Sequence, residues 1–414
     1  MIVVDLLSLV LIGVAASAMP CGEIQPLVFP ITDVQIIPSI SNSLTKGIPA
    51  SIGTPGQTIV FLPWPELNNT WIYDEQPYCD PSIIFSDTIC RVRRGNLYSD
   101  VSSSSYHKAE DIPSAGGAPV ETQGKYAETG ISKLLDSSVP VQDTLDIGSV
   151  QVSESFPFGV PRLSWDHGYT ISHPMGLGSN STLLNTLVKA GRIGSRVWSI
   201  FWGRMWVDAD DAMDGSLVLG GYDSQKVIGK NYTQRLDYSD TTGCWTGMRV
   251  NVASVKLNIR DGDDVELLSP SDAFDACIVP QRQLLLEAPP AIVKGFENTS
   301  GVSSLGPSYG IHWGGYLYDS TNLFDGDMTI SLSSGLEVRI PNNQYLVPYV
   351  DVDRNGSRIF NNSQHELLVA ISYAKYDAPR TLGRYFFTGA YLMVNHDAGT
   401  FTIINYLYGH YNNL

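Results

Sequence analysis

The sequence predicts an all-β protein, built either as two lobes or as one elaborate unit. Its 414 residues exceed what a single hydrophobic core usually serves. Only 16% of them are charged, whereas Gly, Pro and Tyr are abundant at 38, 24 and 21 residues. This composition is typical of short strands joined by turns rather than of long surface helices.

The first elements along the chain follow a hairpin pattern. Turn residues at Gly53–Gly56 precede a short apolar run, Ile59–Leu62, which predicts a turn followed by a strand. Residues 100–130 are rich in Ser, Gly and Pro, and we expect them to form a surface loop. Residues 143–152 then read as a new strand region.

One helix stands out against the strands. Residues 181–193 place apolar side chains at helical spacing, with Ser181 as a candidate N-cap. The remaining apolar or alternating runs predict strands. These runs are 196–207, 215–223, 248–259, 276–279 and 399–404.

Charge and targeting signals point to an exported protein. The formal net charge of -16 argues against nucleic acid or an anionic membrane as a partner. Residues 1–18 form an apolar run, with Ala16 and Ala18 at the positions of a signal-peptide cleavage site. An uncleaved anchor is the alternative. We expect a secreted, extracellular and monomeric chain with no further membrane span.

Sequons and cysteines fit the same compartment. Six Asn-x-Ser/Thr sequons predict N-glycosylation. They lie at Asn68, Asn180, Asn231, Asn298, Asn355 and Asn361. Five cysteines in an exported chain imply disulfides. Cys79 and Cys90 are the first predicted disulfide, because the bond would close only a short loop. Cys244 and Cys277 are a second candidate pair, which requires the fold to bring the two side chains into disulfide geometry. Cys21 would then be free or intermolecular.

Six motifs, in order, make the chain resemble the pepsin-like aspartic proteases, and their fungal members most of all. They cover nearly the whole chain after the signal segment. The motifs are "IGTPGQ", "RGNLYSDVSSSSYHK", "HPMGLG", "SLVLGGYDSQKVIG", "CWTGMRVNVASV" and "TLGRYFFTGAYLMVNHDAGTFTI". The resemblance implies an all-β, bilobal fold with a cleft between an N-terminal lobe, 19–235, and a C-terminal lobe, 236–414.

In active members of that family, each lobe offers one Asp in an Asp-Thr/Ser-Gly loop. Two carboxylates about 3 Å apart share a proton and activate one water, because both cannot ionise together. In the first lobe, the family's spacing from Trp71 places Trp64 at the catalytic position, between Pro63 and Pro65. The loop "PWPELNN" contains no Asp, and Glu66 is its one acid.

The second lobe shows the same loss. Its segment "CIVPQRQLLLEAPP" matches the family's strand and loop without a gap and places Pro280 at the Asp position. Gln281 and Arg282 then replace the Thr/Ser and the Gly. We expect Arg282 to be solvated. The alternatives are that it stabilises an anion or pairs with Glu66 across the cleft. No Asp-Thr-Gly or Asp-Ser-Gly occurs in the sequence, and Asp240-Thr241-Thr242-Gly243 is expected to be an interlobe turn.

Other chemistries find no support in the motifs. The sequence has no Gly-x-Ser-x-Gly elbow. His365 with Glu366 lacks the second His of a zinc helix, and the string at Gly176–Ser181 fails the dinucleotide pattern. We therefore expect neither a cofactor nor a metal.

Three functions follow from these observations. The first is a catalytically inactive, secreted protein whose cleft holds a peptide, a glycan or a protein. The second is an acid endopeptidase with displaced catalytic carboxylates drawn from Glu66, Asp74 or Asp275. The third is an inhibitor of secreted hydrolases, since some plant relatives of the fold resemble proteases yet block xylanases.

Overall fold

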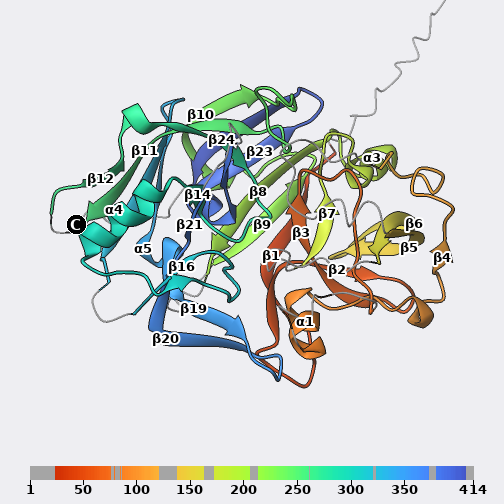
Figure 1. The fold of residues 1–414 in the computed structure, drawn as a ribbon. Helices are drawn as coiled ribbons and strands as arrows, with labels where there is room; N and C mark the ends of the chain where they lie inside the picture. Colours follow the sequence, from red (N-terminus) through yellow and green to blue (C-terminus); the bar gives the residue numbers. More distant parts are fainter. Residues whose placement is uncertain are drawn as a thin grey trace, which may run out of the picture.

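The computed structural model shows a molecule made mostly of strands, drawn in Figure 1. It describes residues 24–75, 79, 84, 86–120, 138–162, 172–205, 213–260, 262–319, 323–372 and 379–406. Strands account for 47% of the chain and helices for 13%, which confirms the predicted all-β class. The expected signal segment, 1–18, and Cys21 lie outside the described residues.

The largest sheet has twelve strands and contains both the first and the last strand of the described residues. Its strands are β1 (Leu27–Gln35), β2 (Leu44–Ile52), β3 (Gln57–Trp64), β4 (His107–Lys108), β5 (Ser138–Ile147), β6 (Val150–Pro161), β7 (His173–Gly176), β8 (Val197–Arg204), β9 (Met213–Leu219), β10 (Val227–Arg235), β23 (Ala390–Asn395) and β24 (Thr400–Tyr406). The last two strands lie between β10 and β8, so the C-terminal strands complete a sheet begun by N-terminal ones. Figure 1 shows them in blue beside the green strands β8 and β9.

Two further sheets belong to the second half of the chain. An eight-stranded sheet contains β11 (Arg249–Ile259), β12 (Val265–Leu268), β13 (Phe274–Ile278), β14 (Leu286–Ala288), β17 (Gly326–Leu332), β18 (Glu337–Ile340), β21 (Val369–Ile371) and β22 (Arg380–Leu382). A four-stranded sheet contains β15 (Gly306–Pro307), β16 (Tyr316–Asp319), β19 (Leu346–Val352) and β20 (Arg358–Leu367). This arrangement agrees with the expected two-lobed, pepsin-like fold. Below, the first lobe runs to Arg235 and the second begins at Leu236.

Short helices fill the connections. They are α1 (Asp87–Arg93), α3 (Thr182–Lys189), α4 (Pro290–Ser300) and α5 (Asn342–Tyr345), with the 3₁₀ segments η1 (Asp100–Ser102), η2 (Ser224–Lys226), η3 (Pro270–Asp272) and η5 (Arg384–Thr388). The predicted helix is confirmed as α3, whose N-cap Ser181 accepts a hydrogen bond from Leu184 N at 3.2 Å.

Each predicted strand run overlaps an observed strand, although several runs extend beyond the strand ends. The run at 143–152 spans the turn between β5 and β6, and those at 196–207 and 215–223 correspond to β8 and β9. The last three correspond to β11, β13 and β24. Residues 100–120 of the predicted loop contain only η1 and the two-residue β4. Asp240 lies in an exposed turn.

The cysteines give one confirmation and one correction. Cys79 and Cys90 form a disulfide with their Cα atoms 6.1 Å apart. The predicted pair of Cys244 and Cys277 is wrong, because both are free thiols. They lie in one small buried cluster with Val279, but the Cys244 sulfur is directed to Thr246 Oγ1 at 3.7 Å.

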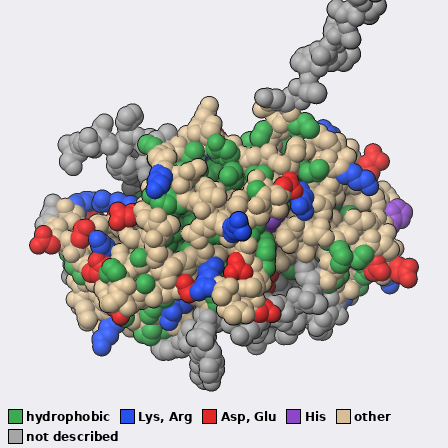
Figure 2. All heavy atoms as spheres, turned by 90° about the horizontal axis from the view of Figure 1, so that it is seen from above, with side chains coloured by type: hydrophobic (Ala, Val, Ile, Leu, Met, Phe, Trp, Pro, Cys, Tyr) green, Lys and Arg blue, Asp and Glu red, His purple; other side chains and the backbone are tan. Residues whose placement is uncertain are grey.

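The surface carries charge of both signs. Figure 2 shows acidic and basic side chains scattered over the face seen from above, with no single-sign stripe on that face. Within the described residues, no helix is both long and apolar enough to span a bilayer.

Candidate ligand-binding site between the lobes

The first predicted loop begins where β3 ends at Trp64. Strand β3 pairs in parallel with β7, which sets Trp64 opposite Gly176. The Trp64 carbonyl accepts hydrogen bonds from Leu177 N at 3.1 Å and Leu67 N at 3.2 Å, so the chain turns immediately. Gly176 is required here, because an added Cβ would lie 2.3 Å from the Asn69 carbonyl oxygen.

Trp64 is a packed core residue. Its side chain is 1% exposed and lies in a cluster with Leu67, Trp71, Tyr73 and Ile112. Its indole Nε1 donates to the Glu66 carboxylate at 3.4 Å. An indole so fully buried fills the end of the strand and presents no face for a ligand to stack on.

The second predicted loop repeats this construction. Strand β13 pairs in parallel with β22, and Val279 N donates to the Leu382 carbonyl at 2.8 Å. Pro280 follows and is buried. Gly383 then passes so close to the loop that an added Cβ would lie 2.1 Å from the Leu284 carbonyl oxygen. Each lobe therefore presents a strand end, a tight turn and a glycine-ended parallel neighbour.

Arg282 is not solvated. It is paired with Glu287 at 2.5 Å, and its side chain is only 15% exposed. The Glu287 carboxylate also accepts a hydrogen bond from Thr381 Oγ1 at 2.8 Å. The expectation of a solvated Arg282 is corrected because its own lobe supplies a carboxylate five residues further along the chain.

The two remaining candidate acids are each held by an arginine. Asp74 forms an ion pair with Arg162, and Asp275 forms one with Arg249. Asp275 also accepts from Asn251 Nδ2 at 3.1 Å on the neighbouring strand β11. These contacts place the two carboxylates in separate networks, one in each lobe.

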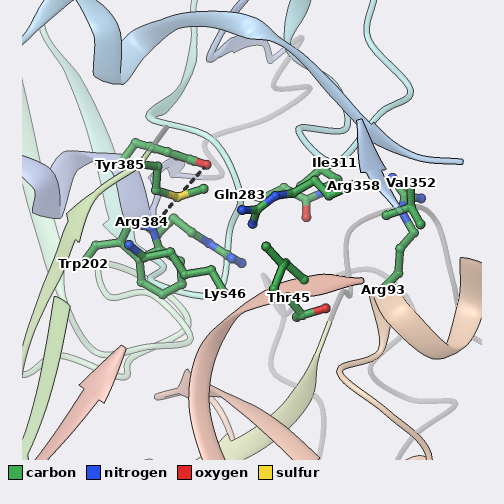
Figure 3. Close-up of a pocket in the computed structure, with 12 residues that line it drawn as sticks. Thr45, Lys46, Arg93, Trp202, Gln283, Ile311, Val352, Arg358, Arg384 and Tyr385 are labelled. Carbon is green, nitrogen blue, oxygen red and sulfur yellow. Dashed lines mark hydrogen bonds between the residues drawn. The ribbon is translucent and has the colours of Figure 1, made fainter. Parts of the chain in front are cut away.

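A cavity of about 40 Å³ lies between the lobes and is shown in Figure 3. The first lobe contributes Lys46, Arg93 and Trp202 to its wall, and the second contributes residues such as Gln283 and Arg384. The lining includes neither Trp64 nor Pro280. Gln283, next to the second loop, is the link between this cavity and the predicted site.

Arg384 connects the second loop to the first lobe. Its guanidinium donates to the carbonyl oxygen of Gln281 and, at 3.1 Å, to that of Arg282. It also lies over the Trp202 ring of β8, 4.7 Å from the ring centre. This cation–π contact fixes the loop against the other lobe. No sequence pattern predicts this contact, because Trp202 and Arg384 are far apart in the chain.

A buried polar chain lies behind the cavity wall. Tyr385 Oη is 2.8 Å from His312 Nε2, and His312 Nδ1 is 2.6 Å from the Glu366 carboxylate. Both His312 and Glu366 are fully buried, and Ser308 also donates to Glu366. The histidine that pairs with the Glu366 carboxylate is therefore His312, and not His365, its neighbour in the sequence. In the described part of the chain, no three His, Cys, Asp or Glu side chains are grouped to hold a metal.

The sequons differ in exposure. Asn180, Asn231, Asn298 and Asn355 are exposed, whereas Asn68 and Asn361 are half-buried. Asn68 Oδ1 accepts a hydrogen bond from Asn180 N at 2.8 Å, which ties the first loop to the turn before α3.

Comparison with known proteins gives a distant relationship. No known protein-family model matches the chain. A stretch of 126 residues is 28% identical to a probable aspartic-type endopeptidase, OPSB, from Arthroderma otae. The match covers 28% of this chain and 25% of that protein, so the chain spans about a quarter of its relative's length. This similarity supports, at a coarse level, the resemblance to aspartic proteases.

Proposed function

We propose that this chain is a secreted, glycosylated, aspartic-protease-like protein that binds a ligand between its lobes without hydrolysing peptides. One observation carries the proposal. At the two strand ends where the resemblance places the family's catalytic Asp residues, this chain has the buried residues Trp64 and Pro280.

The chemistry of acid proteolysis explains why these two positions decide whether the chain can hydrolyse peptides. Acid proteolysis of this kind needs two neighbouring carboxylates, one as the base and one as the acid, acting on one water. Removing a positioned acid–base group typically lowers the rate by roughly 10² to 10⁴ for each role. Glu66, the one acid of the first loop, accepts a hydrogen bond from Trp64. Glu287 of the second segment is paired with Arg282.

An endopeptidase with displaced carboxylates is the competing function. It would need two acids facing one water, yet the candidates Asp74 and Asp275 each bind an arginine in their own lobe. An ion pair turns a carboxylate toward its partner in its own lobe and away from a water shared between the lobes. These contacts favour the non-proteolytic function.

Exposed sequons and the disulfide support secretion. The Cys79–Cys90 disulfide suits an oxidising compartment. Four of the sequon asparagines are exposed, as a glycan requires.

Incubation of the purified full chain with denatured globin, from pH 4 to pH 6, tests the proposal. We expect no release of acid-soluble peptides above a heat-inactivated sample, while an active acid protease in parallel digests the globin. Near-ultraviolet circular dichroism at each pH checks that the chain remains folded during the assay.

Pepstatin-sensitive cleavage by the wild-type chain would overturn the proposal. The displaced carboxylate would then be identified with three variants, Glu66→Gln, Asp74→Asn and Asp275→Asn. Only the substitution of a catalytic acid abolishes that cleavage.

A further inference from the structure

A buried chain of hydrogen bonds crosses from the second lobe into the first at the wall of the interlobe cavity. It begins at Ser308, whose hydroxyl donates to the Glu366 carboxylate. His312 Nδ1 is 2.6 Å from that carboxylate, and His312 Nε2 is 2.8 Å from Tyr385 Oη. Tyr385 Oη also lies 3.2 Å from the sulfur of Met205, which belongs to the first lobe. The chain therefore connects an acid–base pair in one lobe with a side chain of the other.

The Met205 sulfur is held in position to accept this hydrogen bond. The Met205 backbone N–H donates to Gln344 Oε1 at 3.0 Å, and Gln344 Nε2 donates to the Met205 carbonyl oxygen at 3.1 Å. Trp202 Nε1 donates to the sulfur at 3.1 Å. Figure 3 draws the two hydrogen bonds to this sulfur, the yellow atom, as dashed lines. Met205 and Tyr385 both line the cavity, so their contact is part of its wall.

The number of protons decides which acceptor Tyr385 uses. Tyr385 has one hydroxyl proton and keeps it, because burial raises the pKa of its phenol far above the usual value. When the His312–Glu366 pair holds one proton, that proton lies on Nδ1, because a nitrogen lone pair 2.6 Å from a carboxylate oxygen would be repelled by it. His312 Nε2 then has a lone pair and accepts from Tyr385, since a thioether is the weaker acceptor.

One further proton reverses this arrangement. It goes to His312 Nε2, because imidazole is more basic than a carboxylate and because the two Glu366 oxygens already accept from Ser308 and from His312 Nδ1. The protonated Nε2 donates to Tyr385 Oη, whose own proton is then directed to the Met205 sulfur. The proton taken up from solvent stays on the pair, so the O–H bond of Tyr385 does not break.

Charged and titratable side chains from the neighbouring elements act on Glu366 or on Tyr385. They are Tyr349 and Asp351 on β19, Arg358 on β20, Arg384 on η5, Arg93 on α1 and Asp33 on β1. The arginines stay charged, and the two aspartates pair with Arg358 and Arg93. Burial raises the pKa of Tyr349, so this phenol stays neutral. The His312–Glu366 pair is therefore the group in this chain of hydrogen bonds that gains a proton as the pH falls.

We propose that the His312–Glu366 pair is a proton-sensitive coupling between the two lobes. As the pH falls and the pair takes up its second proton, the Tyr385 hydroxyl changes its acceptor from His312 of its own lobe to Met205 of the other. A hydrogen bond then closes across the wall of the cavity. This inference stands on the hydrogen-bond geometry and does not rest on the absence of proteolysis.

Long-range ¹⁵N NMR of the labelled full chain, titrated from pH 8 to pH 4, follows the two His312 nitrogens directly. The spectrum of His312→Gln assigns them, and circular dichroism checks that the chain stays folded. We expect Nε2 to change from an unprotonated to a protonated nitrogen while Nδ1 stays protonated. The Met205 methyl carbon, labelled with ¹³C and assigned with Met205→Leu, should shift with the same midpoint.

A double-mutant cycle measures the contact between the lobes. Tyr385→Phe and Met205→Leu each remove one partner of the hydrogen bond with little change in volume. Urea unfolding of the wild type, both single variants and the double variant gives their coupling as a ratio of equilibrium constants. We expect this ratio to be roughly threefold larger below the His312 midpoint than above it, as for one weak hydrogen bond.

The pair of Tyr406 and Met213 is the matched control. Tyr406 Oη also donates to a thioether, at 3.1 Å from the Met213 sulfur, but its ring stacks on Phe201, which does not titrate. The coupling between Tyr406→Phe and Met213→Leu should therefore be the same at both pH values.

An Nε2 whose protonation does not change in the folded chain would overturn the proposal. A coupling between Tyr385 and Met205 that is equal on both sides of the midpoint would overturn it as well. Cleavage of globin by the chain would contradict the proposed function and leave these results intact, so the two failures are distinguishable.

Discussion

His173 shows how one residue can carry much of the pH dependence of folding. It begins β7, is fully buried, and lies beside the first predicted loop. Its Nδ1 accepts a hydrogen bond from Tyr73 N at 3.0 Å, so the proton is on Nε2, which faces the Asn96 carbonyl at 3.2 Å. Burial, helped by the charge of Arg94, lowers the pKa of His173 to about 3.

The protein should therefore lose stability as the pH falls from 6.5 to about 3. In this window the unfolded chain binds a proton at His173 that the folded chain does not, so protonation favours unfolding. Linkage gives a loss of roughly 3 kcal/mol between pH 7 and pH 4 from this group. Urea unfolding at a series of pH values measures it.

The variant His173→Asn isolates this contribution. Asparagine retains an acceptor for Tyr73 N but does not titrate, so the variant should be less stable than wild type at pH 7 and closer to it at pH 4. His107→Asn, at an exposed position, is the matched control and should leave the profile unchanged. A constant difference between His173→Asn and wild type at all pH values would contradict the assignment.

At the level of secondary-structure elements, local sequence patterns predicted those helices and strands that short-range spacing determines. The helix α3 follows from its apolar spacing and its Ser181 cap, and β11 follows from simple alternation. The helix α4 carries the signals of Pro290 at its first turn and Gly301 at its end, with a φ of 70° at that glycine. Those signals lie in the sequence but predicted no helix, because the surrounding strand pattern dominated.

The site divides in the same way. The positions of Trp64 and Pro280 at strand ends followed from family spacing, since each lies a fixed number of residues from a recognisable motif. The cavity could not be predicted in this way. Its cationic side chains come from β2, α1, β20 and η5, which only the tertiary fold brings together. A net charge of -16 also does not predict that Lys46, Arg93, Arg358 and Arg384 line one cavity.

The sequons should differ in glycan occupancy. Asn68 is half-buried, and its Oδ1 is held against Asn180 N and packs beside Gly178, which leaves little room for a glycan on Nδ2. Asn298, on the exposed face of α4, has no such constraint. Peptide mapping of the secreted protein after enzymatic deglycosylation should find Asn298 modified and Asn68 unmodified.

Alanine variants provide the matched test at these two positions. Asn68→Ala should lower the free energy of unfolding by about 1 kcal/mol through the lost hydrogen bond, and Asn298→Ala, in unglycosylated protein, by less than half of that. A fully glycosylated and correctly folded Asn68 would contradict the structural role given to it.

At the scale of the whole molecule, the lobes are joined on two sides. The strands β23 and β24 complete the shared sheet on one side. On the other, the turn between β19 and β20 packs against the first lobe, where an added Cβ at Gly356 would lie 2.7 Å from Thr88. Val352 belongs to a hydrophobic cluster with Ile89 and Val92 of α1. The lobes should therefore unfold together.

The ion pair between Asp33 and Arg358 is the shorter of two charged pairs on this side, the other being Arg93 with Asp351. Breaking it should weaken the whole molecule. Asp33→Asn leaves a buried arginine without its carboxylate, so we expect a loss of about 3 kcal/mol in the free energy of unfolding.

Asp327→Asn is the control, since Asp327 pairs at 2.7 Å with Arg339, which is 63% exposed, and it should cost less than about 1 kcal/mol. The double variant Asp33→Asn with Arg358→Met should be less destabilised than the sum of the singles, because neither charge is then stranded. Additive losses would mean that the two side chains have no coupling energy. Two separate unfolding transitions in the wild-type chain would mean that the lobes are stabilised independently.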